Sequence, residues 1–214
     1  MRLTALALAA ALLPWAAMPD EPADARAAGR LEAALEGITS FRAEFRQTVT
    51  NAAGQQTESA EGTVALARPG RFRWDYRVPE QLIVSDGTTV WLYDADLAQV
   101  TVRPAAEALV GTPALLLSGQ ADLRAEFDVS DGGTDDGLAW CLLAPRDAQS
   151  DFRELRVGIG DGLLRRMVLV DRLGQTTRLD FDRIERNPRL DPEGFRFLPP
   201  PGVDVVGRAP ADGA

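Results

Sequence analysis

The sequence predicts a mainly β protein, built as one large curved antiparallel sheet with short helices packed against it. Apolar and aromatic side chains alternate with period two over many short segments, such as Phe72, Trp74 and Tyr76, and this spacing is typical of strands. Glycine, proline and aspartate turns separate the segments. The expected strands are too many for a compact sandwich of 214 residues, so a large curved sheet fits better.

The first residues indicate export from the cytoplasm. A single Arg2 precedes an apolar run at 3–13, and small residues follow it, which is the pattern of a secretory signal peptide. The run is shorter than the roughly 20 apolar residues that span a bilayer, although an N-terminal membrane anchor is the alternative. The small-x-small pattern at 23–25 places the end of the signal peptide at residue 25. We therefore expect a signal peptide at 1–25, one domain at 26–207 and a disordered tail at 208–214.

Two segments show helical rather than strand spacing. In 26–38 the apolar residues Leu31, Ala34, Leu35 and Ile38 lie on one face of a short amphipathic helix. The segment 104–119 begins with a proline and is interrupted by a glycine and a second proline, so it predicts two short helical turns. Its apolar residues Val110, Leu115, Leu116 and Leu117 are too many for a bare surface loop, and we expect both segments to cover the sheet as a lid.

The remaining segments predict strands. The pair Asp86-Gly87 predicts a tight hairpin turn, because both residues tolerate a positive φ. A last short strand is expected around Phe195 and Phe197. The other expected strands lie at 41–49, 57–67, 71–77, 97–102, 123–129, 137–144, 152–159, 163–171 and 176–185.

Composition excludes several kinds of chemistry. The chain contains no histidine, which excludes a Ser-His-Asp triad, a Cys-His dyad and a histidine-based zinc site. The only cysteine, Cys141, lies within an expected strand and predicts a buried thiol. The net charge of −9 argues against nucleic-acid binding. Asp94 and Asp96 fit a hairpin turn better than a catalytic pair, and the acidic loop at 131–137 resembles a calcium loop only loosely. We expect no enzyme activity, no cofactor and no metal.

Arg68 and the aromatic residues each allow two interpretations. Arg68 ends a strand just before a proline, so it is either a solvated side chain or a forked donor that reaches the free carbonyl groups at a helix end. The aromatic strand residues either form a core or line a site for a hydrophobic ligand under a detachable lid. These are Phe45, Phe72, Trp74, Tyr76, Trp91 and Tyr93.

Five motifs make the chain resemble the LolA family of periplasmic lipoprotein carriers. They are F-x-A-x-F-x-Q at 41–47, R-P-G-x-F-x-W at 68–74, I-V-S-D-G-x-x-x-W-x-Y at 83–93, G-x-P-x-x-L-L at 111–117 and F-x-F-x-P-P-x-G-V at 195–203. The resemblance implies an unclosed antiparallel half-barrel of about eleven strands with a lid of short helices over a hydrophobic cavity. It also implies that Arg68 hydrogen-bonds the lid backbone and holds the empty carrier shut.

The resemblance further implies a monomeric periplasmic carrier of acylated lipoproteins. Its partners would be an inner-membrane LolCDE-type ABC transporter and a LolB-type outer-membrane acceptor. The acceptor shares the fold but is itself a lipoprotein, which needs a cysteine directly after its signal segment. No cysteine lies near the apolar run of this chain, so the carrier is preferred over the acceptor. The alternative is a module that senses or binds lipid or lipoprotein on the same half-barrel. Such regulators usually carry a second domain, for which this chain has no room.

Overall fold

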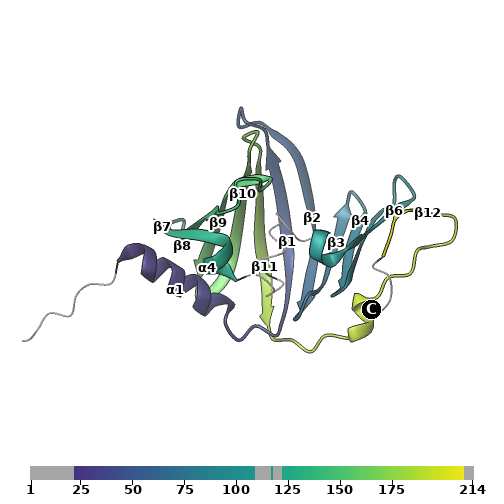
Figure 1. The fold of residues 1–214 in the computed structure, drawn as a ribbon, viewed down its shortest axis with the longest axis horizontal. Coiled ribbons are helices and arrows are strands. Elements are labelled where there is room, and N and C mark those ends of the chain that lie inside the picture. The colour runs from purple at the N-terminus through teal and green to yellow at the C-terminus, as the bar shows by residue number, and fades with distance from the viewer. Residues whose placement is uncertain (1–21, 109–116, 118–121, 210–214) are drawn as a thin grey trace, which may run out of the picture.

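The structure is a computed structural model, which describes residues 22–108, 117 and 122–209. A twelve-stranded sheet dominates it, in the order β12-β6-β5-β4-β3-β2-β1-β11-β10-β9-β8-β7. The sheet is curved, and its two ends stay apart (Figure 1). The predicted unclosed half-barrel is confirmed, with one strand more than expected.

Two antiparallel meanders and the edge strand β12 (Asp204–Gly207) make up this sheet, and the meanders join where β1 pairs with β11. The first meander consists of β1 (Ser40–Thr50), β2 (Gln56–Ala67), β3 (Arg71–Val78), β4 (Gln81–Asp86), β5 (Thr89–Asp94) and β6 (Gln99–Pro104). The second consists of β7 (Phe127–Asp135), β8 (Leu138–Pro145), β9 (Phe152–Gly160), β10 (Leu163–Asp171) and β11 (Thr176–Arg186). In the predicted hairpin turn, the Asp86 carboxylate accepts hydrogen bonds from the backbone N–H groups of Thr88 and Thr89, each at 2.8 Å.

One face of the sheet, called the inner face here, is apolar across both meanders. A row that runs from strand to strand shows this, because Cys141, Val157, Met167 and Leu179 are all at most 5% exposed. Gln47 of β1 continues the same row, since it pairs with Leu179. The outer face of β1 instead bears charged and polar residues such as Arg42 and Glu44.

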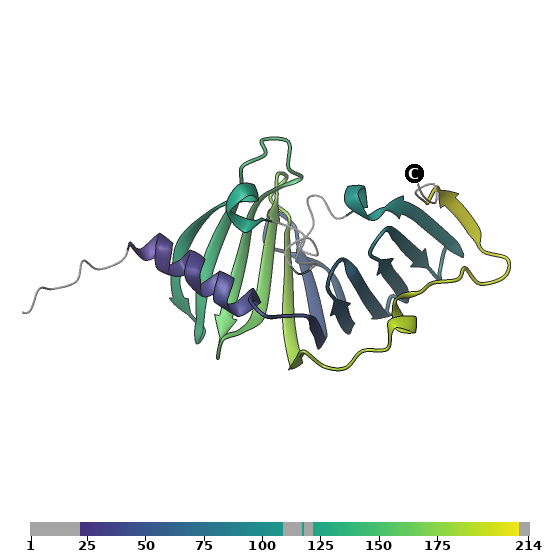
Figure 2. The same cartoon turned by 60° about the horizontal axis from the view of Figure 1, so that its bottom comes forward.

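Helix α1 (Ala23–Leu35) covers the inner face of the second meander only. It contacts β7, β8, β9 and β10, and it lies across these strands in Figure 2. The predicted apolar stripe is confirmed for Leu31, Ala34 and Leu35, which are at most 6% exposed. Ile38 is also buried, but it lies beyond the end of α1 rather than within the predicted helix. The first residues of α1 overlap the predicted signal peptide, whose residues 1–21 lie outside the described part of the chain.

The segment expected as a second lid is described only in part. Helix α2 (Ala105–Ala108) begins it, and Leu117 is helical and 4% exposed. Val110, Leu115 and Leu116 lie outside the described residues. Within the described ranges, no helix is both long and apolar enough to cross a membrane.

Two strand predictions were wrong in detail. The segment expected as a strand at 123–129 begins with helix α4 (Leu123–Glu126), because the Asp122 carboxylate caps its first turn by accepting from the Arg124 and Ala125 N–H groups. The expected strand at Phe195 is a 3-10 turn, η1 (Pro192–Phe195), which Asp191 caps in the same way. The last strand is instead β12 (Asp204–Gly207), which pairs with β6 in parallel.

Candidate functional site

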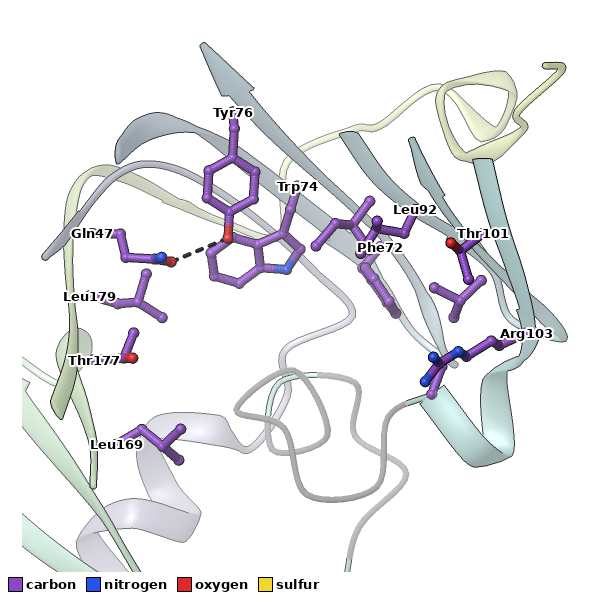
Figure 3. A pocket seen from close by; sticks show the side chains of 13 residues that line it. Gln47, Phe72, Trp74, Tyr76, Leu92, Thr101, Arg103, Leu169, Thr177 and Leu179 are labelled. Carbon is purple, nitrogen blue, oxygen red and sulfur yellow. Dashed lines mark hydrogen bonds between the residues drawn. The ribbon is translucent and has the colours of Figure 1, made fainter. Parts of the chain in front are cut away.

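A cavity of about 420 Å³ opens on the inner face of the sheet, lined mainly by the first meander and on one side by β10 and β11 of the second. This volume falls within the roughly 300–1,000 Å³ that is usual for small-molecule sites. Figure 3 shows Trp74 and Tyr76 between two walls, with Gln47, Leu179, Thr177 and Leu169 on one side and Leu92, Thr101 and Arg103 on the other. The other described lining residues are Phe72, Ile83, Val90 and Ala108.

An aromatic cluster forms one boundary of the cavity. The Phe45 ring packs against the rings of Trp74 and Tyr76, with centroids 5.0 and 4.9 Å apart. These rings meet across β2 because Gly62 has no side chain there. A Cβ atom at Gly62 would lie 1.9 Å from the Asp75 carbonyl oxygen and 2.9 Å from the Phe45 ring. The glycine therefore allows β1 and β3 to build one wall together.

The same close approach produces a polar pair in the cavity wall. The Tyr76 hydroxyl donates a hydrogen bond to Gln47 Oε1 at 3.2 Å, over the gap left by Gly62 (Figure 3). Burial raises the pKa of the Tyr76 hydroxyl to about 12, so this group is a neutral donor at physiological pH.

Four of the predicted cavity residues lie at the cavity, and a fifth, Leu117, does not. Phe72, Trp74 and Tyr76 line the cavity, and Phe45 supports them from behind. Leu117 lies outside this cavity, in a small space of about 10 Å³ that it shares with Leu35 and Arg68.

The prediction that Trp91 and Tyr93 line the cavity was wrong, because the structure places them on the outer face. Their neighbours Val90 and Leu92 face the cavity, and strand alternation turns Trp91 and Tyr93 the other way. There they pack against Phe197, with ring centroids 6.4 and 5.9 Å apart. The C-terminal segment thus covers a second, smaller apolar surface that includes Val84, Val100, Val102 and Phe195, all at most 7% exposed.

Arg68 reaches two backbone carbonyl groups from different segments. Its Nη1 donates to the Leu35 carbonyl at 3.1 Å, at the last turn of α1, and its Nε donates to the Leu117 carbonyl at 3.4 Å. The alternative of a forked donor at a helix end is therefore the one that the structure shows. Burial lowers the pKa of the Arg68 guanidinium from its usual value. Since arginine stays protonated in proteins, Arg68 remains a cation that ties Leu117 to the end of α1.

Other side chains hold α1 to the sheet independently of Arg68. Arg186 donates to the Glu36 carbonyl, and Asn187 Nδ2 donates to the Gly37 carbonyl at 2.8 Å. Arg124 forms a two-point contact with Glu32, which lowers the pKa of that carboxyl group. The Cys141 thiol, whose pKa burial raises, donates to the Ala27 carbonyl at 3.3 Å. α1 contributes no described residue to the lining of the cavity, so a lid role for α1 is not supported.

The acidic pairs make structural contacts, Asp94 within its own hairpin and Asp136 with a side chain of β10. Asp94 accepts from the Leu97 N–H at 3.0 Å and from Gln81 Nε2 at 3.1 Å, as expected for a turn residue. Asp136 forms an ion pair with Arg166 at 3.0 Å. Among residues 22–108, 117 and 122–209, no group of three or more acidic or cysteine side chains is arranged to hold a metal ion.

Comparison with known proteins decides the family. The profile described as "Outer membrane lipoprotein carrier protein LolA" matches residues 36–198. The chain belongs to the LolA family. An outer-membrane lipoprotein carrier protein of Dechloromonas aromatica is 43% identical over 86% of this chain and 89% of its own length. A protein of the same name from Methylobacillus flagellatus is 40% identical over 97% of this chain and its whole length.

Solved structures support the LolA-type fold. A LolA superfamily protein from Nitrosomonas europaea superposes with a TM-score of 0.50 at 12% identity, over 83% of this chain and 99% of that one. An uncharacterized conserved protein from Thermus thermophilus gives a TM-score of 0.54 at 18% identity, over 86% and 98% of the two chains. At these identities the likeness concerns the fold alone.

Sequence reasoning missed more than half of the described cavity lining. For Val90, Leu92 and Ile83 the signal was present, since they alternate with the outer-face residues, but both faces of this hairpin are apolar. Gln47 stood in a LolA motif as the one polar residue of the row Phe41, Ala43, Phe45, Gln47 and Val49. Thr101, Arg103, Ala108, Leu169, Thr177 and Leu179 had no signal of their own, because strand pairing across the sheet brings them together.

Proposed function

We propose that this protein is a periplasmic carrier that accepts acylated lipoproteins at the inner membrane and delivers them to an outer-membrane acceptor. The cavity beside Trp74 supports this proposal, because it offers an apolar site on a sheet of the LolA family. Burial of one methylene group contributes about 0.8 kcal/mol, so three acyl chains of 14–16 carbons represent more than about 30 kcal/mol as an upper bound. Such a lipid does not leave a membrane unaided, and a carrier has to shield its chains from water.

The proposal includes export through a cleaved signal peptide, an inner-membrane LolCDE-type transporter as donor and a LolB-type acceptor. It is a binding function without catalysis, and the mature carrier acts as a monomer. An acyl-chain cargo needs more space than the cavity of about 420 Å³ provides, so loading requires the cavity to widen. We propose that the segment 104–119, which contains α2 and Leu117, moves away from the sheet to make this space.

Arg68 is the proposed latch of the empty state. It joins Leu117, within this segment, to the end of α1, which other contacts keep fixed. Its hydrogen bonds stabilise the closed form and compete with cargo. Hydrogen bonds to a charged group contribute about 1.5–3 kcal/mol each. The carrier then binds its cargo with only moderate net affinity, so that an acceptor with higher affinity can take the cargo over.

The variant Arg68→Leu tests the latch. It should fold, bind cargo about tenfold more tightly and release it more slowly, since the closed form loses its tie while the loaded form loses nothing. The measurement is transfer of a radiolabelled lipoprotein from the purified carrier to an acceptor. Arg186→Leu is the matched control, because Arg186 also donates to a carbonyl group near the end of α1 and borders the same small space, but it forms no hydrogen bond with Leu117 among the described residues. Equal transfer rates for Arg68→Leu and wild type would refute the latch.

A further inference from the structure

The inner-face rows of β1, β3 and β11 each place one polar side chain in the lining of the cavity. On β1, Gln47 interrupts a row whose other members, Phe41, Ala43, Phe45 and Val49, are at most 4% exposed. On β3 the row ends at Tyr76, which lies level with Phe45. On β11, Thr177 precedes the buried residues Leu179 and Phe181, and it pairs with Val49. Strand pairing therefore places Tyr76, Gln47 and Thr177 at successive levels along the lining of an apolar cavity.

The Gln47 amide has a donor to spare at this place. Its Oε1 accepts from the Tyr76 hydroxyl, which leaves the Nε2 group for another partner. The Nε2 group carries two N–H donors, and no described residue accepts a hydrogen bond from it. The Gln47 side chain is half-buried in the cavity wall, so a ligand that displaces water there would have to offer an acceptor oxygen to this donor.

An acyl group has the matching chemistry. It consists of a long apolar chain that ends in an ester or amide carbonyl, whose oxygen is a hydrogen-bond acceptor that also loses water on binding. We propose that Gln47 Nε2 donates to an acyl carbonyl oxygen of the cargo, and that Tyr76 holds the Gln47 amide in the orientation that presents this donor. The inference rests on the proposed carrier function and names the part of the cargo that the cavity distinguishes.

Arg103 offers the competing site, on the opposite wall. Its side chain is exposed and lines the cavity from β6. A site based on Arg103 would favour an anionic group over a neutral carbonyl. The two sites therefore predict different ligand preferences and different sensitive residues.

The test compares two probes of equal chain length, 1-dodecanoylglycerol, which has the ester carbonyl, and 1-O-dodecylglycerol, which has an ether in its place. Dissociation constants are measured by calorimetry for the wild type, Gln47→Met, Arg103→Gln and the control Gln81→Met. Gln81 pairs with Asp94 and does not line the cavity, so the control makes the same substitution elsewhere. The ester-to-ether ratio of each variant is compared with the ratio of the wild type, and this comparison removes the difference in hydrophobicity between the probes.

We expect the wild type and Gln81→Met to prefer the ester by about five- to tenfold, as for one buried hydrogen bond. Gln47→Met should lower this ratio about five- to tenfold relative to the wild type while the ether still binds. A preference that survives in Gln47→Met, or that disappears only in Arg103→Gln, would overturn the inference and leave the carrier function intact. Failure of both probes to bind the wild type, together with no bound lipoprotein in the carrier isolated from cells, would contradict the proposed function itself.

Discussion

The two meanders share one sheet but differ in what covers their inner faces. In the second meander, α1 packs on β7–β10, so that Leu31, Cys141 and Leu143 are 0% exposed, and only its side next to the first meander lines the cavity. In the first meander the same apolar face borders a cavity of about 420 Å³, and Leu92 remains 39% exposed (Figures 2 and 3). Apolar surface thus serves two purposes here. One half stabilises the fold, and the other keeps unfilled apolar surface available for a ligand.

A matched pair of leucine substitutions tests this difference most strongly. Leu31→Ala removes a fully buried side chain beneath α1, and it should lower the free energy of unfolding by about 3–5 kcal/mol. Leu92→Ala should lower it by only about 1 kcal/mol, because its side chain already borders open space. The same variant should weaken cargo binding roughly tenfold, through lost apolar contact. Urea unfolding and cargo titration provide both values, and equal losses of stability would contradict the division into two halves.

Tyr76 makes the stability of the first meander sensitive to alkaline pH. Burial raises its pKa from 10.0 to about 12 in the folded chain. Between these values the unfolded chain has lost the hydroxyl proton and the folded chain still holds it, so the free energy of unfolding falls as pH rises. The loss amounts to about 3 kcal/mol at most. Tyr76→Phe should remove this part of the pH dependence in urea unfolding between pH 9 and 12, and an unchanged slope would show that Tyr76 is solvated.

A smaller effect is expected on the outer face. Phe197→Ala removes the ring contacts with Trp91 and Tyr93, each worth about 0.5–1.5 kcal/mol. The variant should therefore lose about 1–2 kcal/mol of stability and bind cargo as the wild type does, since these rings face away from the cavity. A clear loss of cargo affinity in Phe197→Ala would contradict this assignment and indicate that Trp91 and Tyr93 belong to the binding site.

The inner face of β1 and the hairpin at Asp86-Gly87 could be predicted, because a period-two row and a turn that requires positive φ are local signals. The face of β5 could not, since Val90 and Leu92 are as apolar as Trp91 and Tyr93. Val90 and Leu92 line the cavity, whereas the C-terminal segment covers Trp91 and Tyr93. The parallel pairing of β12 with β6 was equally hidden, because a long return of the chain sets its register.

For the site, sequence reasoning identified single residues better than their arrangement. Arg68 stood out because an arginine before a proline at a strand end has few local partners, and its contacts with Leu35 and Leu117 agree with the role expected of it. The Gln47–Tyr76 pair did not stand out. It depends on Gly62 in the strand between them, and only the register of three strands brings these residues together.

The most direct test of the division between the halves is to map where the cargo's acyl chains lie. A lipoprotein that carries diazirine-labelled palmitate would be isolated in complex with the carrier, irradiated and analysed by mass spectrometry. We expect label on the cavity lining of the first meander, at Phe72, Trp74 and Leu92, and none on the core beneath α1. Label on Leu31, Leu143 or Leu155 would show instead that α1 lifts away and that the second meander receives the chains.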